Sequence, residues 1–316
     1  MKDFWHELPR PFFCMAPMED VTDSAFRALV AGQEKKPDVF YTEFTSADGL
    51  VLAPEEGRQT IMQKLAFSAG ERPIVAQFFT SKPAHLERVA ALAAELGFDG
   101  IDINMGCPDK KVEKQGCGAA LIKNPSLARE LIRAAKRGAP RLPVSLKTRI
   151  GYAQDELDAW LTELLAEDPA AIAIHARTRK DMSAVPSRWD TIARAVAIRN
   201  SIGSGTLIIG NGDVQTVEEG RARAKETACD GIMIGRAAIA NPWIWSGYEP
   251  SKAERIDMLL RHARLAEDHF GPSASGGVRK HLAKFATGFA GAKELRIKMG
   301  AARSAQELIA CVSALK

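Results

Sequence analysis

The chain has 316 residues, of which 46% are hydrophobic and 26% are charged, proportions that exclude disordered, collagen-like and low-complexity proteins. No stretch approaches the roughly 18 consecutive apolar residues of a membrane helix, and the first ten residues, MKDFWHELPR, lack the apolar core of a signal peptide. Five scattered cysteines, an odd number, exclude a disulfide framework. We therefore expect a cytoplasmic protein with a large core and no membrane partner.

Charge is unevenly distributed along the chain. Residues 248–316 hold 12 basic and 7 acidic residues, a net of +5, whereas residues 1–247 hold 31 basic and 32 acidic, a net of −1. Such asymmetry indicates a polyanionic partner for the C-terminal part. A helical tail whose charged face is merely solvated explains it equally well.

Eight short apolar runs of strand length follow one another in the first 240 or so residues. They are residues 12–18, 39–44, 73–79, 100–107, 143–149, 171–177, 206–212 and 231–237. Between them, segments such as 85–97, 126–138 and 156–168 have apolar residues at three- and four-residue spacing, which predicts helices. Eight strand–helix repeats of this length favour an α/β fold of the (β/α)₈ TIM-barrel type over an open sheet.

Beyond Pro250 the strand pattern stops. Residues 252–270, 278–289 and 305–315 instead have the periodicity of helices. We therefore expect two domains, a barrel over residues 1–247 and a small helical domain over residues 248–316.

Polar and titratable residues recur at the carboxyl ends of the predicted strands, where TIM barrels carry their active sites. They are Pro17, Met18 and Glu19, then Glu43, Gln77, Asn104, Cys107, Lys147, Arg149, His175, Arg177, Asn211, Gly212, Asp213, Gly235 and Arg236. A purely structural pattern would scatter such residues over both strand ends. Any single one of them, such as His175, could still have a structural role.

The last two strands end in glycine-rich turns, GNGD at 210–213 and IGRAAIANP at 234–242. In barrels, the loops after strands seven and eight often bind phosphate through backbone N–H groups. Arg236 adds a planar donor that suits phosphate. Although glycine also ends strands for steric reasons, two such turns indicate a phosphate-bearing cofactor.

Cys107 follows the fourth strand in the segment N-M-G-C-P, where a loop should face the site. This position favours a reactive acid or nucleophile over a buried, inert thiol. Cys14, Cys229 and Cys311 fit a strand, a helix end and an apolar helix face, and Cys117 fits a tight loop. No Cys or His spacing typical of a metal site is present, so no metal is expected.

Eight segments of the sequence form a set of motifs: APMEDVTDSAFR (16–27), AQFF (76–79), DINMGCPDKKVEKQGCGAALI (102–122), LKTRIGY (146–152), IHARTR (174–179), IIGNGDV (208–214), MIGRAAIANPW (233–243) and VRKHLAKFATGFAGAKELR (278–296). Together they resemble the flavin-dependent tRNA-dihydrouridine synthases. The resemblance covers nearly the whole chain, although Cys117 is not part of the family pattern.

The resemblance implies an FMN at the mouth of the barrel, reduced by NADPH, that in turn reduces the C5=C6 bond of uridines in tRNA, with ribosomal RNA not excluded. It assigns Pro17, Met18, Glu19, Gln77, Lys147, His175, Asn211, Gly212, Asp213, Gly235 and Arg236 to the cofactor. It assigns Asn104, His175 and Arg177 to the uracil pocket, and Cys107 to the general acid.

In the tail, a basic cluster of Arg279, Lys280, Lys284, Lys293, Arg296 and Lys298 would bind RNA phosphates. We expect a monomer. Two other functions remain open at this point: an FMN barrel enzyme acting on a free pyrimidine, such as a dihydroorotate dehydrogenase, and a non-catalytic RNA-binding barrel.

Overall fold

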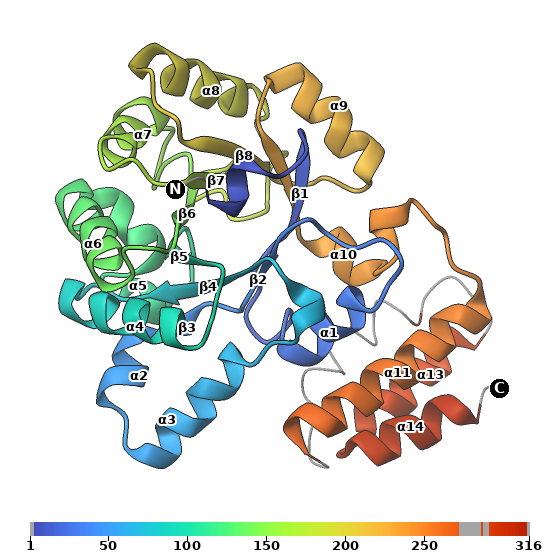
Figure 1. Ribbon diagram of the computed structural model, residues 1–316. Helices are drawn as coiled ribbons and strands as arrows, with labels where there is room; N and C mark the ends of the chain where they lie inside the picture. The colour runs from blue at the N-terminus through green and yellow to red at the C-terminus, as the bar shows by residue number, and fades with distance from the viewer. Residues whose placement is uncertain (1–2, 272–285, 287–290, 315–316) are drawn as a thin grey trace.

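Each of the eight predicted runs contains a parallel strand of one barrel in the computed structural model, which describes residues 3–271, 286 and 291–314 (Figure 1). The strands are β1 (Phe12–Met15), β2 (Phe40–Tyr41), β4 (Ile74–Phe79), β5 (Gly100–Met105), β6 (Val144–Arg149), β7 (Ala171–His175), β8 (Leu207–Asn211) and β9 (Gly231–Ile234). A two-residue strand, β3 (Thr45–Ser46), also pairs with β4.

The strands pair in the order β1-β9-β8-β7-β6-β5-β4-β2. The two ends of this order meet where Cys14 pairs with Val39 and the amide of Met15 donates to the carbonyl of Val39 over 3.1 Å. The sheet is therefore a nearly closed eight-stranded parallel barrel. The TIM-barrel prediction is confirmed.

The two-residue period of each strand decides which side chains face the barrel interior. At the amino-terminal ends, the interior holds an apolar cluster that includes Trp5, Val75, Ala173 and Ile209. On β4, β7 and β8, the residues two positions after Val75, Ala173 and Ile209 are Gln77, His175 and Asn211. The interior thus changes from apolar to polar toward the carboxyl ends, where the site was expected.

Helices that follow the strands along the chain surround the barrel. They are α1 (Ser24–Ala31), α2 (Ala47–Leu52), α3 (Glu55–Met62), α4 (Pro83–Glu95), α5 (Lys110–Glu113), α6 (Pro125–Gly138), α7 (Leu157–Leu165), α8 (Asp190–Ile202), α9 (Val217–Thr227) and α10 (Arg236–Ala240). The start of helix α6 is an example of how the sequence determines where these helices begin. The Asn124 side chain accepts from the amide of Leu127 over 3.2 Å, and Pro125 occupies the first helical position, where its missing N–H costs nothing.

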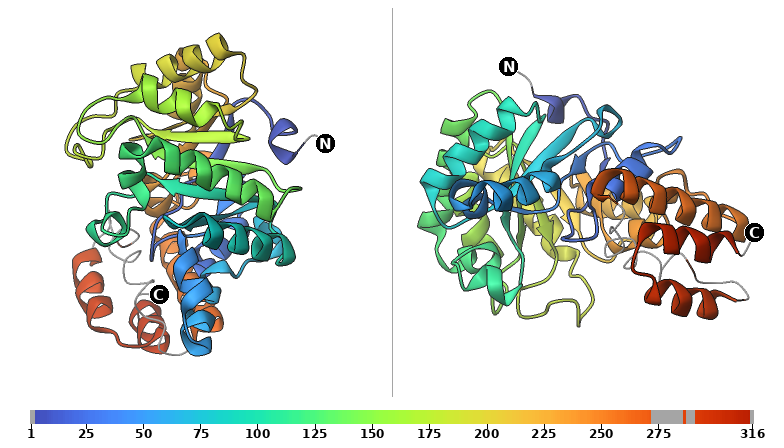
Figure 2. Two further views of the ribbon diagram at one scale, coloured as in Figure 1. Left: turned by 90° about the vertical axis from the view of Figure 1, so that its left-hand side faces the viewer. Right: turned by 90° about the horizontal axis from the view of Figure 1, so that it is seen from below.

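The helical C-terminal region is also present, and Figures 1 and 2 show it grouped beside the barrel, next to α1. It contains α11 (Lys252–Phe270), α13 (Ala292–Ala301) and α14 (Ala305–Ser313). Helices α11 and α14 match expected helices, and α13 was not predicted. The expected helix over 278–289 lies, apart from residue 286, outside the described residues. The division into two domains at residue 247 stays a prediction.

Helix α11 joins this region to the barrel. It packs against α1, and His269 Nδ1 lies 2.9 Å from Ser24 Oγ. In the described part of the chain, none of the helices has both the length and the apolar character needed to cross a membrane.

Candidate functional site at the carboxyl ends of the strands

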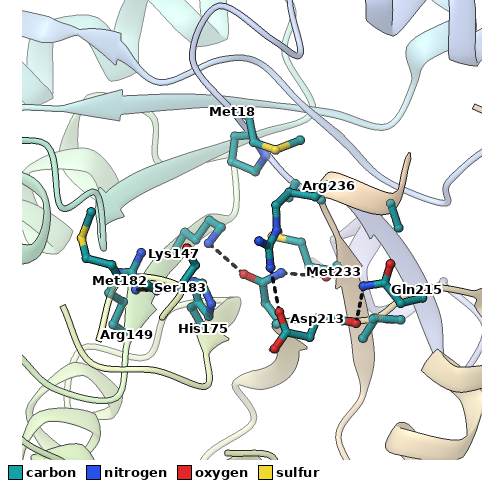
Figure 3. A pocket seen from close by; sticks show the side chains of 17 residues that line it. Met18, Lys147, Arg149, His175, Met182, Ser183, Asp213, Gln215, Met233 and Arg236 are labelled. Carbon is teal, nitrogen blue, oxygen red and sulfur yellow. Dashed lines mark hydrogen bonds and ion pairs between the residues drawn. The ribbon is translucent and has the colours of Figure 1, made fainter. Parts of the chain in front are cut away.

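A cavity of about 280 Å³ opens at the carboxyl ends of β1, β6, β7, β8 and β9 (Figure 3). Its lining comprises Ala16, Pro17, Met18, Lys147, Arg149, His175, Met182, Ser183, Asn211, Gly212, Asp213, Val214, Gln215, Met233, Gly235, Arg236 and Ala237. Nine of the residues predicted to hold the cofactor are thus brought together: Pro17, Met18, Lys147, His175, Asn211, Gly212, Asp213, Gly235 and Arg236.

Lys147 comes from the interior face of β6. Its Nζ donates to Asn211 Oδ1 over 3.2 Å, and Asn211 Nδ2 donates to the carbonyl of Met233 over 2.8 Å. Burial, with a smaller contribution from the Arg149 charge, lowers the pKa of Lys147 to about 8. Lys147 is therefore mostly charged at neutral pH and close to losing its proton.

His175 stands at the end of β7, two residues before Arg177. Burial, aided by the charges of Lys147 and Arg149, lowers the pKa of His175 to about 2, so the ring is neutral. Arg177 Nη1 lies 3.2 Å from His175 Nε2. A guanidinium can only donate, so Nε2 accepts and the ring proton sits on Nδ1.

Asp213 connects two arginines at the rim of the cavity. Its Oδ1 accepts from Arg236 Nη2 over 2.7 Å, and its Oδ2 accepts from Arg177 Nη2 and from Ser187 Oγ. Burial alone would raise the pKa of Asp213, but the hydrogen bonds from Arg177 and Ser187 outweigh it and lower the pKa. Figure 3 shows Asp213 and Arg236 turned toward each other.

Two glycines, Gly212 and Gly235, follow directly after the last two strands. Gly212 has φ of 134°, where L side chains are strained, and a Cβ there would come within 2.3 Å of Ser187 Oγ. Gly235 directly precedes α10, whose first N–H groups have no acceptor within the helix. An anionic group can therefore approach the backbone closely at this point.

The donor set fits a phosphate-bearing cofactor with a flat ring. Among the described residues that line the cavity, three cations (Lys147, Arg149 and Arg236) face one carboxylate, Asp213. The other walls include the thioethers of three methionines (Met18, Met182 and Met233), which can pack against a planar ring. The residues present therefore fit FMN.

Cys107 does not line this cavity but stands on the loop after β5. Asn104 Oδ1 accepts from the amides of Gly106 and Cys107 over 3.2 and 2.9 Å, and Arg149 Nε donates to the carbonyl of Gly106 over 2.7 Å. Gly118, at φ of 61°, passes so close that a Cβ would lie 2.7 Å from the Cys107 carbonyl. The loop is thus fixed from several sides.

The Cys107 side chain is half-buried, and burial, with the nearby Asp109 and Glu19 carboxylates, raises its pKa. The thiol is therefore protonated at neutral pH. Cys117 is 1% exposed, its Sγ lies 3.4 Å from the carbonyl of Gln115, and burial raises its pKa to about 11. Of the two thiols, Cys107 is the more accessible.

Other predicted residues lie outside the lining. Gln77 and Asn104 are buried below it and bonded to each other, and Arg177 is held by Asp213 and by the carbonyl of Val185. Glu19 forms an ion pair with Lys64, with 3.0 Å between Oε1 and Nζ. Arg279, Lys280 and Lys284 lie outside the described residues.

Sequence reasoning gave no role to several lining residues. Arg149 was expected at the same strand end as Lys147 but was assigned to neither the cofactor nor the substrate. Met182, Ser183 and Gln215 belong to loops, where no periodicity could identify them. Within residues 3–271, 286 and 291–314, no cluster of three or more His, Cys, Asp or Glu side chains could hold a metal ion.

Known proteins similar to this chain agree with the motifs. The family profile described as "Dihydrouridine synthase (Dus)" matches residues 14–316. The "Probable tRNA-dihydrouridine synthase 2" of Bacillus subtilis (strain 168) is 41% identical over 314 residues, which cover 97% of this chain and 94% of the relative. The "Probable tRNA-dihydrouridine synthase" of Staphylococcus aureus (strain COL) is 40% identical over 302 residues, which cover 93% and 90%.

Solved structures resemble the barrel at low sequence identity. Histamine dehydrogenase from Rhizobium sp. 4-9 aligns with a TM-score of 0.56 and 11% identity over 80% of this chain and 48% of its own. The old yellow enzyme homologue from Zymomonas mobilis aligns with a TM-score of 0.51 and 13% identity over 77% and 90%. These likenesses bear on the fold alone. The profile match over nearly the whole sequence, together with relatives about 40% identical, shows that the chain belongs to the dihydrouridine synthase family.

Proposed function

We propose that the protein is a tRNA-dihydrouridine synthase, which uses FMN and NADPH to reduce the C5=C6 bond of uridines in tRNA. The observation that carries the proposal is the Cys107 thiol on a fixed loop, which is tied through the Gly106 carbonyl to Arg149 in the lining of the cation-rich cavity, in a chain of this family. The names of the Bacillus and Staphylococcus relatives support the choice of tRNA as substrate.

The lining residues divide into two groups that suit the two ends of FMN. The backbone at Gly212 and Gly235, with the Arg236 guanidinium, would hold the phosphate. Lys147 and His175, with Met18, would surround the ring system. When bound there, FMN would supply the hydride for C6 of uracil and would be reduced again by NADPH.

Cys107 would supply the proton that completes the reduction. Hydride addition at C6 leaves negative charge at C5 and O4 of the uracil ring, and a proton at C5 then balances the reaction. A proton donor must hold its proton at working pH, and the raised pKa of Cys107 meets this condition. The S–H bond breaks, the C5–H bond forms and the thiolate regains a proton from solvent.

Lys147 and His175 would define the electrostatics of the pocket. The ammonium group of Lys147 would stabilise negative charge that develops beside it. His175 stays neutral, so it offers a fixed hydrogen-bond pattern, with the proton on Nδ1, and adds no second charge next to Lys147. Asp213 repels phosphate through its side chain, so we assign to it the orientation of Arg236.

The tRNA would lie across the carboxyl ends of the strands and the basic C-terminal region. A uridine must leave its stack to reach Cys107, which costs a few kcal/mol that contacts to the RNA backbone elsewhere must offset. Lys293 and Lys298 are exposed on α13 and available for such contacts.

The test uses purified protein loaded with FMN, NADPH and unmodified tRNA transcripts, with free pyrimidines as alternative substrates. Dihydrouridine in the tRNA, detected by mass spectrometry, with no reduction of free bases, is the expected result. Reduction of a free pyrimidine but not of tRNA would identify a dihydroorotate dehydrogenase-like enzyme. RNA binding without flavin bleaching by NADPH would identify a non-catalytic barrel.

A further inference from the structure

A chain of buried polar side chains runs from the centre of the barrel to the Cys107 loop. Ser145 Oγ donates to Asp102 Oδ1 over 2.6 Å, and Gln77 Nε2 donates to Asp102 Oδ2 over 2.6 Å. Asn104 Nδ2 then donates to Gln77 Oε1 over 3.0 Å. At the far end, Asn104 Oδ1 accepts from the backbone amides of the Cys107 loop.

Every link in this chain has its direction fixed by the two ends. The amides of the Cys107 loop can only donate, so Asn104 must turn its oxygen to them and its NH₂ group to Gln77. Gln77 must then turn its own NH₂ group to position 102. An ionised carboxylate is acceptor-only, so Asp102 completes the chain with no alternative orientation.

Because these hydrogen-bonded side chains are buried, the loss of any one of their bonds is costly. Asp102 and Gln77 are 0% exposed and Asn104 is 5% exposed, so water does not replace a lost partner. A buried amide without its acceptor costs more than the bond itself contributes, and Gln77 would rotate to find one. Rotation of Gln77 would release Asn104 and, with it, the amides of Gly106 and Cys107.

We propose that Asp102 is a positioning residue for the reaction: as terminal acceptor of the Gln77–Asn104 chain, it holds the Cys107 loop in its working place. The inference rests on the proposed function for its effect on catalysis, but its effect on the loop is independent of any ligand. Asp102 itself contacts neither the cavity nor Cys107. Burial raises the pKa of Asp102 to about 6, which leaves the carboxylate mostly ionised at neutral pH.

Two nearly isosteric substitutions of Asp102 distinguish its role as a hydrogen-bond acceptor from the effect of its negative charge. Asp102→Asn removes the charge but can still turn an oxygen to Gln77, because Ser145 Oγ can instead donate to the carbonyl of Ile101, 3.3 Å away. Asp102→Leu has a similar shape and no acceptor. Ser145→Ala is the matched control, since it removes a bond to the same carboxylate on the side away from Cys107.

The first measurement is alkylation of Cys107 by iodoacetamide in the protein without FMN, followed peptide by peptide with mass spectrometry. We expect Asp102→Leu to speed Cys107 alkylation about tenfold, and Asp102→Asn and Ser145→Ala to stay within about threefold of the wild type. The buried thiols of Cys14 and Cys229 report whether each variant is folded, because they stay unlabelled only in folded protein.

The second measurement is dihydrouridine formation by the FMN-loaded variants. Displacement of a catalytic group by about 1 Å can cost on the order of 10²-fold, so we expect Asp102→Leu to lose about 10–100-fold in kcat with little change in KM for tRNA. Asp102→Asn should retain most of kcat. A wild-type protein that forms no dihydrouridine would refute the proposed function, whereas the alkylation result would still decide the role of Asp102.

An Asp102→Leu variant in which Cys107 is alkylated at the wild-type rate and kcat is unchanged would overturn the proposal. Equal losses in Asp102→Asn and Asp102→Leu would overturn it too, because the charge and not the acceptor would then matter. If Asp102→Leu does not fold, Gln77→Met interrupts the same chain at its middle link. Its Cys107 alkylation should also rise about tenfold, and an unchanged rate would refute the role of the chain.

Discussion

The Nζ atom of Lys147 lies 3.2 Å from Oδ1 of Asn211, on the side of the cavity that also holds Arg149 and His175. This ammonium group is partly desolvated and stands close to a second cation, which is why its pKa falls to about 8. The pocket therefore carries its full positive charge only below about pH 8.

The first prediction concerns this charge. Deprotonation of Lys147 as the pH rises from 7 to 9 should weaken FMN binding by the FMN-free protein, measured by quenching of flavin fluorescence. In Lys147→Met the affinity should be lower at pH 7 and lose this pH dependence. Lys147→Arg, charged throughout this range, is the control that should retain binding at pH 9. Equal pH profiles for the wild type and Lys147→Met would refute the assignment.

The second prediction concerns the acid. Cys107→Ala should keep FMN and tRNA binding but lose about 10²–10⁴-fold in product formation, the usual contribution of a general acid. Cys117→Ala should be nearly silent in catalysis, because the Cys117 thiol is buried among Val112 and Phe44. Single-turnover formation of dihydrouridine in tRNA separates the two outcomes. A comparable loss in Cys117→Ala would mean that the wrong thiol has been assigned.

The third prediction concerns the rim of the cavity. Arg236→Ala should lower the FMN content of purified protein, and excess FMN should restore most activity. Asp213→Asn weakens the bonds that orient both Arg236 and Arg177, so it should reduce FMN content and also slow the reaction of the loaded enzyme. Full flavin occupancy of Arg236→Ala after extensive dialysis would count against a phosphate site here.

The barrel could be predicted because its strands are buried on both faces and therefore form apolar runs. The carboxyl ends of the strands could be located for the same reason. Nine of the residues predicted from these ends to hold the cofactor line one cavity. Helix α13 was missed although Ala292, Leu295 and Met299 have helical spacing, because the segment is short and the apolar Ile297 lies on its exposed side.

Side-chain pairing within the site could not be predicted. The bond from Gln77 to Asp102 depends on the register between β4 and β5, which long-range pairing decides. The same holds for the ion pair between Arg177 and Asp213, which lie two residues beyond the ends of β7 and β8. The two side chains meet because these strands pair with His175 opposite Asn211. The residue types at the strand ends indicate a site, but the hydrogen-bond and ion-pair partner of each side chain follows only from the register between neighbouring strands.

The fourth prediction concerns stability. Arg27 and Glu71 form an ion pair in which both side chains are 0% exposed, with 2.7 Å between Nε and Oε2. Arg27→Met leaves the Glu71 charge buried without its partner and should lower the free energy of unfolding by about 3–5 kcal/mol. Urea denaturation measures the loss.

The control is an arginine whose side chain is exposed. Arg133→Met removes one partner of Glu167, which keeps Arg129 as a second partner, so the loss of stability should be much smaller than for Arg27→Met. Adding Glu71→Gln to Arg27→Met should recover part of the loss, because the amide oxygen can still accept from the amide of Ser68. An equal cost for both arginine substitutions would contradict the buried-charge argument.

The last prediction concerns the basic tail. Deleting residues 248–316 would uncover the face of α1 on which α11 packs, so point substitutions give the cleaner test. Lys280→Ala with Lys284→Ala removes two charges from a segment outside the described residues. The control, Lys35→Ala with Lys225→Ala, also removes two charges. Lys35 lies in the loop after α1 and Lys225 in the last turn of α9, both at the amino-terminal side of the barrel, opposite the cavity.

If the tail lysines contact RNA phosphates, each lost contact should flatten the slope of log affinity against log salt concentration by about 0.7–0.9. The tail variant should therefore bind tRNA less tightly at low salt and with a shallower slope, while NADPH oxidation by the bound flavin stays unchanged. The Lys35 and Lys225 variant, with the same net charge, should keep the wild-type slope. Equal slopes for the tail variant and the wild type would mean that these lysines belong only to a solvated face, and RNA affinity must then come from the carboxyl-end loops.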